Sequence, residues 1–173
     1  MDFNALYIAH KNMVYNLALQ YVQNTEDAEE ITQDVFISVF KKMGRFKAKA
    51  TLKTWIYRIA INKSLDFIKA QKSAKRSFFF NSNKIDDENN NIQLPSFDHP
   101  GVILENKEAI KRLFKAINQL SDKQKTALIL LKIEDKSQKE TAEIMKLSEK
   151  AIESLFQRAK KKLGEILKKS KDY

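Results

Sequence analysis

Basic and aromatic residues are interleaved through the stretch from Arg45 to Lys72, a pattern that can bind nucleic acid. Between Lys41 and Lys63 the chain carries eight basic residues and no acidic one. Basic side chains neutralise phosphates, and aromatic rings offer faces on which unpaired bases can stack. An amphipathic helix with core aromatics and a solvated lysine face would have the same composition, so this stretch alone does not decide between the two. The aromatic residues are Phe46, Trp55, Tyr57 and Phe67.

Motifs that support catalysis are missing from the sequence. The three glycines, Gly44, Gly101 and Gly164, are too scattered to build a phosphate-binding loop or a dinucleotide fingerprint. Neither G-x-S-x-G nor H-E-x-x-H occurs. Paired carboxylates such as Asp86 and Asp87 lie in a segment without a rigid scaffold. We therefore expect a protein that is not an enzyme, with no metal site and no cofactor.

The composition suggests a soluble helical protein with an anionic partner. The chain has 173 residues and a formal net charge of +10, which favours nucleic acid, although a lysine-rich solubilising surface would also be basic. The absence of cysteine suits a reducing cytoplasm. The N-terminal residues do not resemble a signal peptide, and no apolar run approaches the roughly 20 residues that span a bilayer. We expect a cytoplasmic protein without direct membrane insertion.

Three helical patterns occupy the first part of the chain. Apolar residues at steps of three and four predict a helix over 3–21 and another that begins at Asn24 or Thr25. A third helix is predicted from about Thr51 to Lys72, so that the three form a first domain over residues 1–72. In the second helix, acidic residues near the start indicate either capping or a docking face for a basic partner. The predicted buried stripe of this helix consists of Ile31, Val35, Val39 and Met43, and Phe36 and Phe40 widen it.

Helical periodicity is lost over residues 73–103, which contain both prolines and an asparagine run and are predicted to be a flexible linker.

Helical periodicity returns in a second domain, which is predicted over residues 104–173. Capping boxes begin at Ser121 (SDKQ) and Ser137 (SQKE), and Ser148 can cap a last helix that ends near Lys168. A short helix, a tight turn and a long basic helix indicate a helix-turn-helix, although such units also occur in proteins that do not bind DNA. The predicted fold is all-α, with two small helical bundles joined by the linker.

Three segments in this order resemble a bacterial RNA polymerase sigma factor of the extracytoplasmic-function (ECF) type in the sigma-70 family. They are DAEEITQDVFISVF (27–40), TLKTWIYRIAINKSLDFIK (51–69) and LSDKQKTALILLKIEDKSQKETAEIMKLSEKAIESLFQRAKKKL (120–163). The resemblance covers nearly all of the chain except the linker. It implies a protein that binds core RNA polymerase, directs it to promoters and helps to open the −10 element.

The resemblance also implies roles for residues of the first domain. One face of the second helix would bind the clamp helices of the polymerase β′ subunit, and the loop and helix after Gly44 would bind the −10 element. In the family a base is flipped into a pocket beside this loop, which Phe46, Lys47, Lys49 and Asn62 would line or guard. The implied polymerase-binding residues are Glu30, Gln33, Asp34 and Phe36. The implied −10 residues are Phe46, Lys47, Lys49, Thr51, Trp55, Arg58, Asn62 and Lys63.

In the second domain, the resemblance implies that the helix-turn-helix reads the −35 element and that the β flap of the polymerase is a further partner. Glu153 and Leu155 stand at positions that are commonly basic in the family, so the base preference is open. An anti-sigma factor is another partner that the resemblance implies. The implied −35 residues are Ser137, Gln138, Ser148, Lys150, Glu153, Ser154, Gln157 and Arg158.

Two other functions remain open on the sequence. A stand-alone helix-turn-helix regulator would use the first bundle for dimerisation or sensing, and would bind duplex DNA tightly without polymerase. An adaptor that binds only proteins would use the acidic face of the second helix, and would show no dependence on promoters. In vitro transcription with purified core enzyme separates these three functions.

Overall fold

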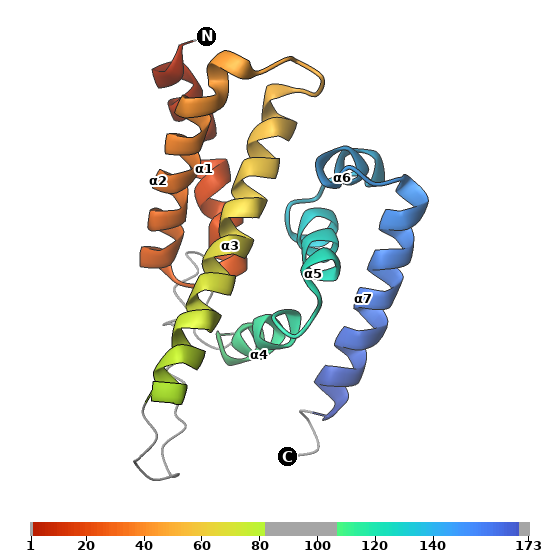
Figure 1. Cartoon of the computed structure of the whole chain (residues 1–173). Coiled ribbons are helices and arrows are strands. Elements are labelled where there is room, and N and C mark those ends of the chain that lie inside the picture. The colour runs from red at the N-terminus through yellow and green to blue at the C-terminus, as the bar shows by residue number, and fades with distance from the viewer. Residues whose placement is uncertain (1, 82–106, 170–173) are drawn as a thin grey trace.

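The computed structural model describes residues 2–81 and 107–169, and within these ranges the chain is helical without strands. Figure 1 shows α1, α2 and α3 side by side, with α4 to α7 along one side of α3. The all-α architecture is thus confirmed. The elements are α1 (Phe3–Val22), α2 (Thr25–Lys42), the 3-10 turn η1 (Met43–Arg45), α3 (Leu52–Asn81), α4 (Lys107–Ile117), α5 (Asp122–Leu128), the π-helical turn η3 (Ile129–Ile133), α6 (Gln138–Met145) and α7 (Glu149–Lys169).

Side-chain caps set the start of the first two helices. The Asp2 carboxylate accepts hydrogen bonds from the backbone N–H groups of Asn4 and Ala5 at the start of α1. The Asn24 side chain accepts a 2.9 Å hydrogen bond from the backbone N–H of Asp27, which confirms a start at this point for α2. Each cap satisfies a donor that the first helical turn leaves without an intrahelical partner.

Helix α3 is longer than the sequence pattern predicted. The prediction ended this helix near Lys72 and began an irregular linker at Ser73, whereas α3 continues to Asn81. No glycine or proline occurs between Ser73 and Asn81, so nothing in the local sequence forces the helix to stop. The rest of the predicted linker lies outside the described residues, as do the first residues predicted for the second domain.

The buried face of α2 is narrower than predicted. Val35 and Val39 are fully buried, but the Phe40 side chain is 61% exposed and rests its ring edge against Phe3, with 5.2 Å between the ring centroids. The prediction that Phe40 belongs to the buried stripe is therefore wrong. Successive helical residues are about 100° apart, so Phe40 is rotated from Val39 towards the rim of the α1–α2 contact.

The helix-turn-helix forms as predicted. Both capping boxes are present, with Ser121 paired to Gln124 and Ser137 paired to Glu140. Lys146 takes a left-handed conformation (φ 55°) at the end of α6, and this reverses the chain into α7. Ser148 then accepts a 3.2 Å hydrogen bond from the backbone N–H of Ala151 in the first turn of α7.

The two halves of the chain share one hydrophobic core. Ile129, Leu130 and Ile144 from the second half are buried in the same cluster as the apolar residues of α1, α2 and α3. A smaller cluster, built on Phe114, Leu128 and Ala159, holds α4, α5 and α7 together. The sequence pattern assigns each half an apolar face of its own, but it does not show that the second half packs against α3.

Candidate nucleic-acid interface

The loop before α3 carries exposed lysines and one ring of an aromatic pair. The half-buried Phe46 ring packs on the Trp55 ring with 5.1 Å between centroids and 44° between planes. Lys47 and Lys49 are exposed, and neither they nor Phe46 belong to a helix. Thr51 anchors the end of the loop because its Oγ1 accepts a 3.1 Å hydrogen bond from the backbone N–H of Thr54. The ring pair therefore fixes a loop whose cations point to solvent.

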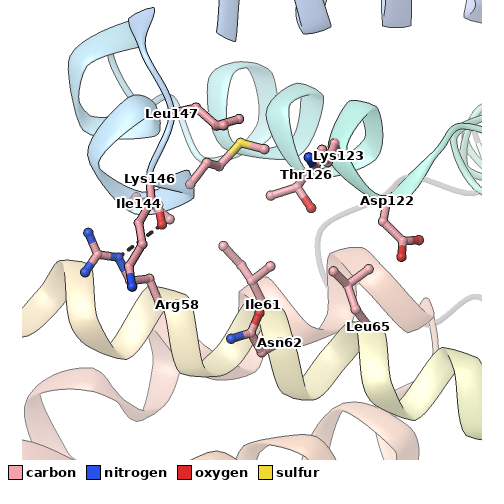
Figure 2. Close-up of a pocket in the computed structure, with 11 residues that line it drawn as sticks. Arg58, Ile61, Asn62, Leu65, Asp122, Lys123, Thr126, Ile144, Lys146 and Leu147 are labelled. Atoms are coloured by element: carbon pink, nitrogen blue, oxygen red, sulfur yellow. Dashed lines mark hydrogen bonds between the residues drawn. The ribbon is translucent and has the colours of Figure 1, made fainter. Parts of the chain in front are cut away.

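Arg58 of α3 faces the second half of the chain. Its Nη2 donates a 2.6 Å hydrogen bond to the carbonyl of Glu143, and its Nε donates a 3.2 Å bond to the carbonyl of Ile144. These carbonyls belong to the last turn of α6, the end of the helix that carries partial negative charge. The guanidinium thus binds at the negative end of a helix, as Figure 2 shows for its bond to Ile144.

A cavity of about 330 Å³ lies between α3 and the α5–α6 segment. Arg58, Ile61, Asn62 and Leu65 line it from α3, while residues of α5, of the last turn of α6 and of the turn after α6 line the opposite wall, as Figure 2 shows. Asn62 is exposed, so it is accessible from this cavity. Two residues of the predicted −10 surface, Arg58 and Asn62, therefore lie at the junction between the halves.

Lys63 connects the predicted DNA-binding and polymerase-binding surfaces. Its Nζ lies 3.2 Å from Oδ2 of Asp34 on α2, and both side chains are partly exposed. An exposed ion pair of this kind contributes at most about 1 kcal/mol to stability, because water and salt screen it. Either partner can therefore leave the pair at little cost when a stronger partner binds.

The predicted polymerase-binding residues divide into two groups. Glu30, Gln33 and Asp34 are exposed on α2, whereas Phe36 is only 3% exposed and packs edge-on against Tyr7 at 4.8 Å. Phe36 thus supports the surface from beneath.

Sequence reasoning missed Ile37 on this helix, which is 51% exposed, and placed the exposed Phe40 in the core. Their spacing of four and then three residues from Gln33 puts all three on one helix face. This spacing is the sequence signal from which Ile37 and Phe40 could have been assigned to the exposed face of Gln33.

The predicted −35 residues of α7 share one exposed helix face. Their spacing of three and four residues places them together, while Ile152 and Ala159 are fully buried on the opposite side. Arg158 is held along the helix because its guanidinium donates to the backbone oxygen of Ser154 at 3.3 Å and to its Oγ at 3.0 Å. The exposed residues of this face are Lys150, Glu153, Ser154, Gln157 and Arg158.

The other predicted −35 residues, Ser137, Gln138 and Ser148, lie exposed at the starts of α6 and α7. The Ser137 Oγ and backbone N–H each donate a 2.9 Å hydrogen bond to the Glu140 carboxylate. These bonds lower the pKa of Glu140, because hydrogen bonds to the ionised form stabilise it. The start of α6 is therefore capped by a charged carboxylate.

Buried polar contacts join the two halves. Tyr21 and Thr126 share a 2.8 Å hydrogen bond between their hydroxyl oxygens, and Lys125 Nζ donates to the backbone carbonyl of Tyr21 at 3.0 Å. Burial, together with the positive charge of Lys72, lowers the pKa of Lys125 to about 8. Burial also raises the pKa of Tyr21, so its hydroxyl stays protonated and able to donate.

Family models match both halves of the chain. The model for sigma-70 region 2 matches residues 6–74, and the model for sigma-70 region 4 matches residues 110–163. Together the two matches cover well over half of the chain, in the order expected from the sequence. The chain belongs to the sigma-70 family. Within this family, region 2 corresponds to α1, α2 and most of α3, and region 4 corresponds to most of α4–α7.

Relatives of the sigma-70 family match over most of their own length. The chain is 27% identical over 91% of its length to the ECF RNA polymerase sigma-E factor of Haemophilus influenzae, covering 83% of that protein. It is 22% identical over 95% of its length to the RNA polymerase sigma-H factor of Pseudomonas aeruginosa, covering 86% of that protein. These names identify the chain as similar to RNA polymerase sigma factors of the ECF type.

Solved structures share the fold. The sigma factor RpoE, crystallised with the anti-sigma factor NepR from Bartonella quintana, matches with a TM-score of 0.65 and 23% identity, over 96% of this chain and 97% of that one. CnrH, in complex with the cytosolic domain of CnrY, matches with a TM-score of 0.64 and 21% identity, over 96% and 87%. The chain therefore shares its fold with these two solved structures.

Proposed function

We propose that this protein is an ECF-type sigma factor, which binds core RNA polymerase, directs it to a subset of promoters and helps to open the −10 element. The observation that carries this proposal is the presence, in one chain, of a region 2 bundle, whose exposed cationic loop contributes one ring of an aromatic pair, and a region 4 helix-turn-helix. The protein needs no chemistry of its own for this role, because strand opening is driven by binding.

Opening of the −10 element would begin at the loop before α3. Unstacking a base costs a few kcal/mol, which contacts to the unpaired strand must offset. The exposed Lys47 and Lys49 would bind phosphates, and Phe46 and Trp55 would provide the surface beside which a flipped base lies. Thr51, Asn62 and Lys63 would continue the contact along α3.

The −35 element would be read by the exposed face of α7 in the major groove. Glu153 can accept a hydrogen bond from cytosine N4, and Gln157 can pair with adenine, so this face favours bases other than the guanine that a basic residue would select. Lys150 and Arg158 remain for phosphate contacts. The starts of α6 and α7, at Ser137, Gln138 and Ser148, would fix the register on the DNA backbone.

Core polymerase would bind the exposed face of α2. Glu30, Gln33 and Asp34 provide polar and acidic groups, and Ile37 and Phe40 add apolar area beside them. A mixture of apolar and polar side chains is typical of protein interfaces. The partner would be the clamp helices of the β′ subunit, with the β flap as a second contact for region 4.

An anti-sigma factor is a further partner in this proposal. RpoE was crystallised with an anti-sigma factor. The shared fold supports a comparable partner for this chain, which would act in the cytoplasm. Among the residues that the structure describes, no helix is both long and apolar enough to cross a membrane.

In vitro transcription tests the proposal. Purified core polymerase with this protein should start RNA chains from a subset of genomic DNA fragments, and sequencing those transcripts would reveal the promoter. Core polymerase alone is the control. Equal initiation with and without the protein would refute the proposal, and tight binding to specific duplex DNA without polymerase would indicate a stand-alone regulator instead.

A further inference from the structure

The ammonium group of Lys125 is buried, and the proposed function does not use it. Lys125 is only 5% exposed. Its Nζ donates a 3.0 Å hydrogen bond to the carbonyl oxygen of Tyr21 and a 2.5 Å bond to Oδ1 of Asn118. Both acceptors are neutral, and among residues 2–81 and 107–169 no carboxylate forms an ion pair with this ammonium. A buried charge is costly unless an opposite charge compensates it, so this position favours an anion.

A cavity of about 240 Å³ adjoins this ammonium. The end of α1, the second half of α3 and the segment from Asn118 to Lys125 form its walls. Sites for drug-sized ligands have volumes of roughly 300–1,000 Å³, so this cavity suits a more compact ligand. None of the residues that line it belongs to the proposed DNA-binding or polymerase-binding surfaces.

A second lysine faces the same cavity. Lys72 of α3 is exposed and, within the described part of the chain, its ammonium has no hydrogen-bond or ion-pair partner. After burial, the charge of Lys72 is the next cause of the lowered pKa of Lys125, so the two ammonium groups repel each other. The one carboxylate among the described lining residues is that of Asp122, whose Oδ2 lies 3.2 Å from Nζ of Lys69. The cavity therefore has two cations, and its single carboxylate already has a partner.

We propose that this cavity binds a compact, doubly charged oxyanion of the phosphate class between the ammonium groups of Lys125 and Lys72. This inference goes beyond the proposed function and does not depend on it. An ammonium group has three N–H donors, and the two bonds of Lys125 leave one of them for the ligand. Lys72 contributes a point charge of the kind that binds phosphate. A dianion matches the two positive charges and removes their mutual repulsion.

A neutral donor also lines the cavity. Gln71 of α3 donates from Nε2 to Oδ2 of Asp27 at 3.2 Å, and its amide has a second N–H. Each N–H that points to an anion forms a charge-assisted bond, which is stronger than a bond between neutral groups. The ligand would thus be held by donors from α3 and from α5.

The first measurement is calorimetric titration of the full-length protein with sodium sulfate at constant ionic strength, with chloride as the balancing anion. We expect saturable binding of one sulfate per chain. Titrations with inorganic phosphate and with glycerol 3-phosphate distinguish a free anion from a phosphate ester, because the ester binds more tightly only if its carbon chain also contacts the cavity. No saturable binding of any of these three anions would overturn the inference.

Three variants identify the residues that bind the anion. Lys72→Ala should weaken sulfate binding by about tenfold or more, which corresponds to the loss of one charge-assisted contact. Lys125→Met should abolish saturable binding. Lys11→Ala is the matched control, because Lys11 is an exposed lysine of α1 that does not line the cavity. Lys72 is exposed, so its variant decides the question even if Lys125→Met does not fold. Equal affinities for Lys72→Ala and Lys11→Ala would refute the proposed site.

The second measurement is the pH dependence of sulfate binding. Burial, with the charge of Lys72, lowers the pKa of Lys125 to about 8, so this residue loses its proton as pH rises through 8, whereas sulfate keeps its charge. The affinity should therefore fall by about tenfold between pH 7 and 9. Tyr21 of α1, Lys72 of α3 and Asp122 of α5 also face this ammonium.

The Lys72→Ala variant tests which group causes this pH dependence. Loss of the Lys72 charge raises the pKa of Lys125, so the fall in sulfate affinity should move to higher pH. The Lys11→Ala control should keep the profile of the unmodified protein. A sulfate affinity of the unmodified protein that does not change between pH 7 and 9 would show that exposed lysines bind the anion, and would contradict the inference.

Discussion

The Nζ atom of Lys63 lies 3.2 Å from Oδ2 of Asp34, so the proposed DNA-binding helix and the proposed polymerase-binding helix are joined by one exposed ion pair. A pair of this kind is weak and exchangeable. Polymerase that binds Asp34 would release Lys63, and the freed ammonium would then be available to a phosphate. The two proposed surfaces are therefore adjacent and share a charge.

Reversal of the charge at Asp34 should impair capture by core polymerase. In Asp34→Arg the α2 face gains a cation beside Lys63. A polymerase surface that is complementary to the Asp34 carboxylate would repel this cation, so binding should weaken. The free energy of unfolding should change by less than about 1 kcal/mol, because the lost pair is exposed. A pull-down with core enzyme measures the effect. Glu29→Arg, an exposed residue of the same helix outside the proposed surface, should retain binding; equal loss in both variants would contradict the prediction.

Removal of the two loop cations should weaken promoter opening more than polymerase binding. In the variant Lys47→Ala, Lys49→Ala, the salt dependence of single-strand binding should be shallower by roughly 1.4, the value for two lost phosphate contacts. Permanganate footprinting of the −10 region should show fewer reactive thymines. The control Lys111→Ala, Lys115→Ala removes the same charge from the exposed side of α4. An unchanged footprint in the loop variant would contradict the prediction.

The buried ammonium of Lys125 should make stability rise with pH in the alkaline range. Burial lowers the pKa of Lys125 in the folded state to about 8, below the usual value of 10.5. Between these values the unfolded chain binds more protons than the folded protein, so the free energy of unfolding increases as pH rises from about 8 to 10. The gain is at most a few kcal/mol.

Urea unfolding at several pH values tests this prediction, with Lys125→Met as the control. The methionine variant should lack the rise because it has no ammonium to lose. Measurements stop near pH 10 because the pKa values of Tyr21 and Tyr57 are raised in the folded protein. Above the usual tyrosine pKa these two residues lose their protons in the unfolded chain first, and this lowers the free energy of unfolding. Parallel pH curves for both proteins would show that Lys125 does not contribute.

Replacement of Lys146 by glycine should stabilise the helix-turn-helix. Lys146 has φ 55° at the end of α6, a conformation that costs a residue with Cβ about 1 kcal/mol. Glycine adopts it without that cost, although the more flexible unfolded chain offsets part of the gain. Thermal unfolding should shift upwards by a few degrees. Lys150→Gly, in the first turn of α7, should instead destabilise the protein, and a lower midpoint for Lys146→Gly would refute the explanation.

Local features were predictable from sequence because their physics is local. The capping boxes at Ser121 and Ser137, the Asn24 cap and the turn at Lys146 depend on a few adjacent residues, and all of them are present in the structure. The end of α3 was not predictable, because no local signal marks it between Ser73 and Asn81. The exposure of Phe40 depends on where α1 meets α2, which the periodicity of one helix does not specify.

The sequence by itself determined an all-α chain of the sigma-70 family, because helix periodicity, caps and the three motif segments depend only on residues that are close together in the sequence. The roles of the individual site residues remain predictions. Only the tertiary structure decided that α6 and η3 pack against the first bundle and that Arg58 binds the α6 carbonyls. The two Arg58 bonds join residues 85 and 86 positions apart. The partners in these contacts are backbone oxygens and apolar side chains, which carry no distinguishing pattern in the sequence.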